Sequence, residues 1–279
     1  MLEQVDLNRS LNDDEYHERM AALKLKMYDL GHAVYVSKTP VVIVFEGWAC
    51  AGKGRAIAEL TSRLDPRGFR VYPISEPNCV EKEFPWLQRF WLRIPAYGEM
   101  SIFDGSWYRH VTLDRAAKEI DKAAWNQALQ DIREFERTLA DDGTVIVKFF
   151  LHISEKEQKR RIKRLLADRA TAWQVGEVEM IEQDKYDRFV KLTEQVLEQT
   201  AAEHARWTVV PATDGHLVDV KVFETLIERL DPVVKPSEAP LPADTQQKLD
   251  AILEQDKADL GAPPPGKPSG NDEPGASHA

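Results

Sequence analysis

The sequence predicts a three-layer α/β/α fold, in which helices cover both faces of a five-stranded parallel sheet. Short runs of β-branched and aromatic residues alternate with longer amphipathic segments along the chain, as expected of parallel sheets with helical connections. The runs are apolar throughout, which is typical of strands that are buried on both faces. Clusters of Gly, Pro and Asp separate the segments. With 279 residues, the chain is long enough for one sizeable hydrophobic core.

The same patterns place the individual elements. The opening helix begins near Asp13, and its apolar residues recur at helical spacing on one face. Ser154 and Glu157 fit a capping box, in which each side chain satisfies a backbone N–H at the start of a helix. The expected strands are 41–45, 69–74, 99–103, 144–151 and 207–210. Helices are expected at 13–36, 53–64, 85–94, 154–167, 179–201 and 217–230. Between the third and fourth strands, one helix runs from about 106 into the 120s and helix is expected again up to 140.

Composition divides the chain into a folded domain at 1–230 and a tail at 231–279. Nine of the sixteen prolines lie in the last 49 residues, together with a Gly/Ser/Asp-rich ending. Such a segment buries too little apolar surface to fold by itself. We therefore predict a largely disordered tail, with a short helix at about 244–260.

Charge and hydrophobicity exclude several classes of protein. The net charge of −10 argues against a nucleic-acid-binding protein, although a local basic cleft can still bind a polyanion. The apolar run at 41–45 is far shorter than the roughly 20 residues that span a bilayer. The first residues lack the pattern of a signal peptide, and two cysteines make no disulfide framework. We expect a cytoplasmic protein that binds neither nucleic acid nor membranes.

A glycine-bearing loop follows the first strand and opens the next helix, as the phosphate-binding pattern G-x-x-x-x-G-K requires. In such a loop the backbone N–H groups point at phosphate oxygens, and the helix N-terminus adds partial positive charge. An ordinary strand-to-helix turn is the less favoured alternative. Gly54 has no hydroxyl for a metal, so Mg²⁺ would be held by carboxylates and water. The predicted phosphate-binding residues here are Gly47, Ala49, Cys50, Ala51, Gly52, Lys53 and Gly54.

Two further segments carry the chemistry that a phosphate site needs. Asp104 ends the third strand, and ligands in open α/β sheets bind at the carboxyl ends of strands. We predict that Asp104 holds Mg²⁺, the alternative being a helix cap. The helix after Ser154 is rich in cations, and Arg164 and Arg161 are the best candidates to stabilise charge during transfer. The alternative for each cation is a solvated basic face.

These segments together resemble the polyphosphate kinase 2 family, over about residues 13–230. The resemblance implies a P-loop kinase-like core with a helical lid at about 155–180, Mg²⁺-dependent phosphoryl transfer between inorganic polyphosphate and adenine or guanine nucleoside mono- or diphosphates, and a homo-oligomer. We predict Lys53, Asp104 and Arg164 as catalytic, and Arg109, Arg115, Arg160 and Arg161 as phosphate-binding residues. The matching pieces are Phe45-Glu46-Gly47, Ala51-Gly52-Lys53-Gly54, Arg89-Phe90-Trp91, Ile102-Phe103-Asp104, Ser106-Trp107-Tyr108, Phe150-Leu151-His152-Ile153-Ser154, Glu157-Gln158, Arg160-Arg161 and Trp207-Thr208-Val209-Val210-Pro211-Ala212.

The chain departs from the family pattern at three places. Ala49 stands where the family usually has Asp, and Gly105 stands where it has Arg, as in the non-catalytic amino-terminal half of tandem-domain members. No lysine or arginine adjoins Trp173 in the lid. These departures define a second hypothesis, a catalytically impaired module that binds polyphosphate or nucleotide. A third hypothesis is an ATP-dependent small-molecule kinase of the wider P-loop class. Candidate substitutes for the missing groups are Glu46, Glu76, Arg109 and Arg115.

Overall fold

A computed structural model of the protein describes residues 2–234, except the side chains of 177–179 and 181. Its five strands form one sheet in which every neighbouring pair is parallel, as predicted. The strand order is β2-β3-β1-β4-β5, so β1 lies at the centre. The strands are β1 (Val41–Gly47), β2 (Phe69–Pro73), β3 (Met100–Asp104), β4 (Val145–His152) and β5 (Trp207–Pro211).

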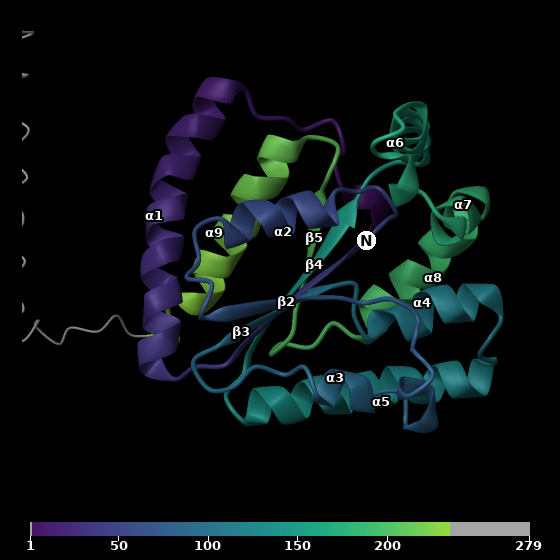
Figure 1. Ribbon diagram of the computed structural model, residues 1–279, viewed down its shortest axis with the longest axis horizontal. Coiled ribbons are helices and arrows are strands. Elements are labelled where there is room, and N and C mark those ends of the chain that lie inside the picture. The colour runs from purple at the N-terminus through teal and green to yellow at the C-terminus, as the bar shows by residue number, and fades with distance from the viewer. Residues whose placement is uncertain (1, 235–279) are drawn as a thin grey trace, which may run out of the picture. The chain divides into compact units, whose positions relative to one another are not determined.

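Helices cover both faces of the sheet and complete the three layers (Figure 1). One face carries α1 (Asp13–Ser37), α2 (Lys53–Thr61) and α9 (Gly215–Leu230). The other carries α3 (Gln88–Trp91), α4 (Tyr108–Ala117), α5 (Lys122–Asp141) and α8 (Tyr186–Gln199). Short 3-10 turns lie at Leu2–Gln4 and Glu81–Glu83.

A helical segment leaves the sheet between β4 and α8, at the place predicted for a lid. It contains α6 (Glu155–Ala167), a 3-10 turn (Ala172–Gln174) and α7 (Glu177–Asp184). The single helix expected at 179–201 is in fact two, because the backbone of Lys185 leaves the helical conformation. We call residues 155–184 the lid. Of the helices in the described part of the chain, none is long and apolar enough to cross a membrane.

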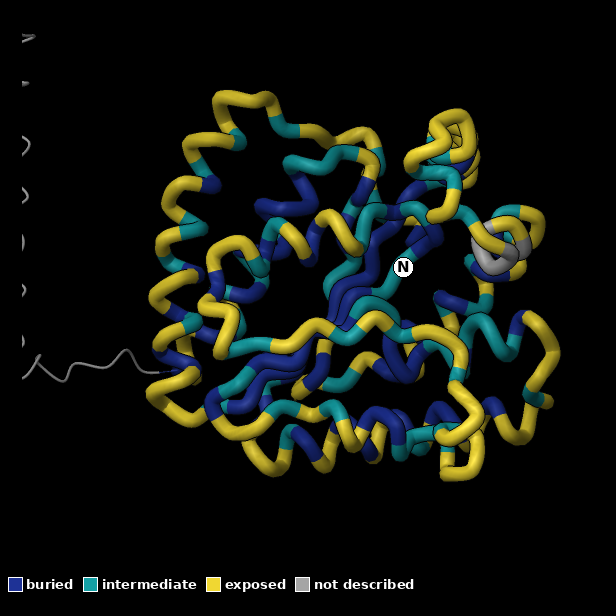
Figure 2. Tube along the Cα trace, viewed as in Figure 1, coloured by how far each residue is buried: buried dark blue, intermediate teal, exposed yellow. Residues whose placement is uncertain are grey.

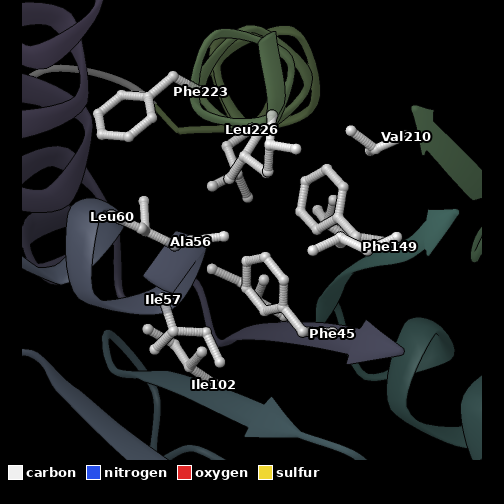
Figure 3. Close-up of a cluster of buried hydrophobic side chains, with 14 of the residues drawn as sticks. Phe45, Ala56, Ile57, Leu60, Ile102, Phe149, Val210, Phe223 and Leu226 are labelled. Carbon is white, nitrogen blue, oxygen red and sulfur yellow. The ribbon is translucent and has the colours of Figure 1, made fainter. Parts of the chain in front are cut away.

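The central strand is buried on both faces, as its unbroken apolar run predicts (Figure 2). Ile43 and Phe45 pack toward α2 and α9, whereas Val42 and Val44 pack toward α4 and α5. Figure 3 shows the first of these clusters, in which the Phe45 ring packs among side chains of α2 and α9. Its centroid lies 5.1 Å from that of the Phe149 ring. This packing fixes the end of β1, from which the glycine-bearing loop begins.

The parallel order brings the carboxyl ends of β3, β1 and β4 side by side. Phe45 pairs with Asp104 on one side of β1, and Gly47 pairs with Leu151 on the other. The capping box is half confirmed: Ser154 accepts a hydrogen bond from the Glu157 N–H, but the Glu157 carboxylate binds Arg160 and Arg161 instead of reaching back. The three segments singled out in the sequence therefore meet at one edge of the sheet.

The folded part ends close to the predicted boundary. Helix α9 stops at Leu230, as expected, and the chain continues to Val234, which is buried in the core. The rest of the predicted tail, including the short helix expected at about 244–260, lies outside the described residues.

Candidate functional site

The loop between β1 and α2 has the geometry of an anion-binding turn. Gly47 has φ +141°, and a Cβ there would stand 2.7 Å from the backbone N of Leu151, so only glycine fits. Gly52, at φ +102°, precedes the first turn of α2. Within the described residues, no hydrogen bond is made by the backbone N–H groups of Gly52, Lys53 and Gly54. Three open donors at a helix N-terminus are suited to hydrogen-bond the oxygens of an anion such as phosphate.

Lys53 and Asp104 lie between two cavities and line both of them. The first, which we call the β3 cavity, has a volume of about 430 Å³ and lies beside Glu46, Arg109 and the start of α4. The second, the lid cavity, has a volume of about 670 Å³ and lies between the glycine loop and the lid. The Lys53 Nζ donates to the carbonyls of Gly47 and Trp48, at 3.1 and 3.3 Å. Two ligands that entered the two cavities would therefore meet at these side chains.

Carboxylates gather on the β3 side of Lys53. Asp104 ends β3, and Glu46 near the end of β1 accepts a hydrogen bond of 2.7 Å from Ser106 Oγ. Desolvation raises the pKa of Glu46 above its usual range. The described residues contain no group of three or more His, Cys, Asp or Glu side chains placed to hold a metal by themselves. Asp104 can supply one carboxylate, and this suits Mg²⁺, which takes one or two carboxylates together with substrate phosphates and water.

The segment after Asp104 is fixed by a buried polar network, and its aromatic residues do not reach the cavities. Glu136 accepts hydrogen bonds from Trp107 Nε1 at 3.0 Å and from the Tyr108 hydroxyl at 2.8 Å. Lys148 donates to Glu136 at 2.7 Å, to Tyr108 at 2.8 Å and to the carbonyl of Thr200 at 3.0 Å. All four side chains of the network are almost fully buried. Trp107 and Tyr108 therefore hold the start of α4 in place.

Three of the predicted arginines line the two cavities, and two of them, Arg109 and Arg164, donate to no loop carbonyl among the described residues. Arg109 lines the β3 cavity and pairs with Glu76 at 3.3 Å; its buried Nε has no hydrogen-bond partner among the described residues and lies 4.0 Å from the Asp114 carboxylate. Arg164 lines the lid cavity, where no acidic side chain of the described chain forms an ion pair with it. Both guanidinium groups are therefore placed to bind an added phosphate.

The other predicted arginines have different surroundings. Arg161 lines the lid cavity, but its guanidinium donates to the carbonyls of Cys50, Ala51, Ala212 and Thr213, and so connects the loop to the end of β5. Arg160 is exposed and pairs with Glu157. Together these two arginines lower the pKa of Glu157 to about 2, chiefly through the hydrogen bond from Arg160. Arg115 lies in a separate cavity of about 320 Å³ between α4, α5 and α8.

One lid residue reaches the site although no sequence pattern singles it out. Glu182 of α7 is buried, lines the β3 cavity and accepts a hydrogen bond of 2.8 Å from the backbone N–H of Ala49. Gln158 of α6 donates to the same Glu182 oxygen at 2.7 Å. Ala49 and Glu182 are 133 residues apart, so only the fold brings them together.

The loop is also attached to the end of β4. Trp48 donates a hydrogen bond of 2.7 Å from Nε1 to Nδ1 of His152, and its ring packs against Tyr186 at the start of α8. Burial lowers the pKa of His152 to about 4, so this ring is neutral near pH 7. His152 therefore packs at the end of its strand and links the loop to β4.

Comparison with known proteins gives consistent similarities. Residues 10–237 match the family described as Polyphosphate kinase 2. The chain is 34% identical over 235 residues to a polyphosphate:AMP phosphotransferase of Pseudomonas aeruginosa, covering 84% of this chain and 47% of that protein, so it spans about half of that relative's length. It is 31% identical over 215 residues to an AMP/ADP-polyphosphate phosphotransferase of Meiothermus ruber, covering 77% of this chain and 80% of that protein. The crystal structure of polyphosphate kinase 2 from Arthrobacter aurescens superimposes with a TM-score of 0.82 at 25% identity, covering 90% of this chain and 93% of that one.

Proposed function

This chain belongs to the polyphosphate kinase 2 family, and on that premise we propose that it transfers phosphoryl groups between inorganic polyphosphate and a nucleoside mono- or diphosphate. The observation that carries the proposal is the position of Lys53 and Asp104 between two cavities. Phosphoryl transfer needs a donor and an acceptor that meet in line at one charge-stabilising centre. A single cavity would serve a hydrolase equally well, whereas two cavities that share Lys53 suit a transferase.

In this proposal the polyphosphate enters the lid cavity, where Arg164 is available, and the nucleotide enters the β3 cavity with its phosphates toward Lys53. An oxygen of the acceptor phosphate forms a bond to the terminal phosphorus of the polyphosphate, and the bond from that phosphorus to the bridging oxygen breaks. The shortened polyphosphate leaves with the bridging oxygen. The phosphate acceptor is already ionised near pH 7, so no general base is required.

The protein's contribution is charge and position. The N–H groups of Gly52, Lys53 and Gly54 point at one phosphate, and the Lys53 ammonium exchanges its two loop carbonyls for phosphate oxygens. Arg109 and Arg164 add positive charge from the two cavities. Mg²⁺ held by Asp104 and substrate oxygens would supply further neutralisation of the phosphate charge.

The test is formation of ATP or ADP from long-chain polyphosphate and ADP or AMP in the presence of Mg²⁺. We expect Lys53→Ala to lower the rate by about 10²–10³-fold or more, as loss of a charge-stabilising donor does in other enzymes. Lys159→Ala is the control, since Lys159 is an exposed lysine of the lid helix α6. Equal rates for the wild type and Lys53→Ala would contradict the assignment.

A second candidate is a binding module of the same family with impaired catalysis. It is favoured by Ala49 and Gly105, which bring no charged side chain to the cavities, and by Arg161, whose guanidinium is occupied by the loop. A wild-type protein that binds polyphosphate but forms no product in either direction would support it. Cytoplasmic location, adenine or guanine specificity and a homo-oligomer stay predictions.

A further inference from the structure

A carboxylate of the lid occupies one backbone donor of the phosphate-binding loop. The Glu182 Oε1 lies 2.8 Å from the backbone N of Ala49, in the buried wall of the β3 cavity. We call the contact among Glu182, Ala49 and Gln158 the α7 contact. Gln158 bridges its two sides, because its amide nitrogen lies 2.7 Å from Glu182 Oε1 and 3.4 Å from the Ala49 carbonyl.

The donor that Glu182 takes belongs to the same loop as the open donors. Ala49 stands between Gly47, which shapes the loop, and the N–H groups of Gly52, Lys53 and Gly54, which make no hydrogen bond within the described chain. One N–H cannot donate fully to a carboxylate and to a phosphate at once. A carboxylate beside the loop also repels an entering phosphate, and this repulsion is strong where water is excluded.

We propose that Glu182 is a positioning residue that competes with substrate phosphate for the loop, so that phosphate binding and the α7 contact exclude each other. In the absence of substrate, the α7 contact is formed and the lid lies against the loop. An entering phosphate takes the Ala49 N–H, and α7 is released from the loop. The inference rests on the proposed function, since it takes the loop to be the seat of a substrate phosphate.

Two observations suit a contact that breaks and re-forms. Gln158 is fully buried, yet its Oε1 has no hydrogen-bond partner among the described residues, which penalises the state in which the contact is formed. In the part of the lid that follows α6, the large apolar side chains of Trp173 and Met180 are exposed, whereas α6 itself is held to the loop by Arg161. A segment with few buried apolar contacts opens at lower free energy than the core.

The proposal predicts a gain of binding on removal of a side chain, which a merely structural role would not produce. We would measure the affinity of the full chain for ADP, the acceptor that the proposed function places in the β3 cavity beside Ala49 and Glu182, by calorimetry at fixed ionic strength. If the contact is formed in nine molecules of ten, its removal tightens apparent binding about tenfold, because only the remaining tenth is competent. We expect the largest gain for Glu182→Ala and a smaller one for Glu182→Gln, which keeps an acceptor but loses the charge.

Asp184→Asn is the matched control, since it removes one negative charge from an exposed position of the same helix. Unchanged or weaker binding by both Glu182 variants, with folding intact by circular dichroism, would overturn the proposal. So would an equal gain in Asp184→Asn, which would mean that only the net charge matters.

Hydrogen exchange separates this proposal from the proposed function. The Ala49 amide should be protected in the wild type without ligand and should exchange at least several-fold faster in Glu182→Ala. Equal exchange rates overturn the competition whatever binds. If the Ala49 amide of the wild type is protected but the protein binds no ADP, the proposed function is contradicted, and the competition with it.

Discussion

The two halves of the site are built in opposite ways. On the β3 side, Asp104 is followed by Trp107 and Tyr108, which are fully buried and bonded to the Glu136–Lys148 pair. On the lid side, Trp173 is 79% exposed and the buried connection to the loop is the α7 contact. One half therefore has the interactions of a core, and the other has those of a surface segment.

The difference shows which interactions hold each half in position and how easily those interactions break. A buried polar network with every member paired fixes a unique arrangement, and removal of one member leaves an unpaired group in a low dielectric. A lid held by polar contacts can leave and return at small energetic cost. The proposed phosphoryl transfer needs both, because the charge-stabilising centre must be fixed while the substrates enter and depart.

The largest expected effect is a loss of stability from a substitution in the buried network of the β3 side. Lys148→Met removes the buried cation and leaves Glu136 without its ion pair, so we expect a loss of about 3–5 kcal/mol in the free energy of unfolding. Chemical denaturation monitored by tryptophan fluorescence gives the value. Arg160→Ala in the lid is the comparison: the Arg160 side chain is 60% exposed and Arg161 still pairs with Glu157, so we expect a loss several-fold smaller than that of Lys148→Met. Similar losses in both variants would show that the two halves do not differ as described.

A smaller effect tests the link between the loop and β4. The pKa of His152 is about 4 when folded and about 6.5 when unfolded, so the unfolded chain binds the additional proton between these values. The contribution of His152 to the free energy of unfolding is fully present above pH 6.5 and is lost as the pH falls toward 4. Between pH 7 and pH 5 the loss is about 2 kcal/mol. His152→Gln, which does not titrate there, should lack this component in unfolding curves at the two pH values. An identical pH dependence in both proteins would contradict the neutral, buried ring.

The smallest effect concerns the turn after Asp104. Gly105 has φ +69°, while the nearest atom to an added Cβ is the Ile74 carbonyl oxygen at 3.6 Å, so a side chain there meets backbone strain rather than a steric overlap. Gly105→Ala should lower stability by about 1–2 kcal/mol. Gly54→Ala is the control, because a Cβ there meets open space within α2, and thermal unfolding should show no loss. A stable Gly105→Ala protein would mean that the turn relaxes, and would make Gly105→Arg a practical test of the missing arginine.

The sequence by itself determined the fold and the centre of the candidate site. The apolar run of β1, the glycines at 47 and 52 and the position of Asp104 at a strand end suffice, because strand burial, positive φ and parallel order are local or repetitive properties. The sequence alone therefore predicts that Lys53 and Asp104 lie at one edge of the sheet.

Only the tertiary structure decided how the surrounding side chains are used. The basic helix α6 carries several arginines at similar spacing, yet Arg164 lines the lid cavity, Arg161 binds loop carbonyls and Arg160 pairs with Glu157. Arg115 lies in another cavity. Glu182 binds the backbone N–H of Ala49, a residue 133 positions earlier in the sequence. Such outcomes depend on which donors and acceptors the folded chain sets within about 3 Å of one another, and no periodicity in the sequence encodes that distance.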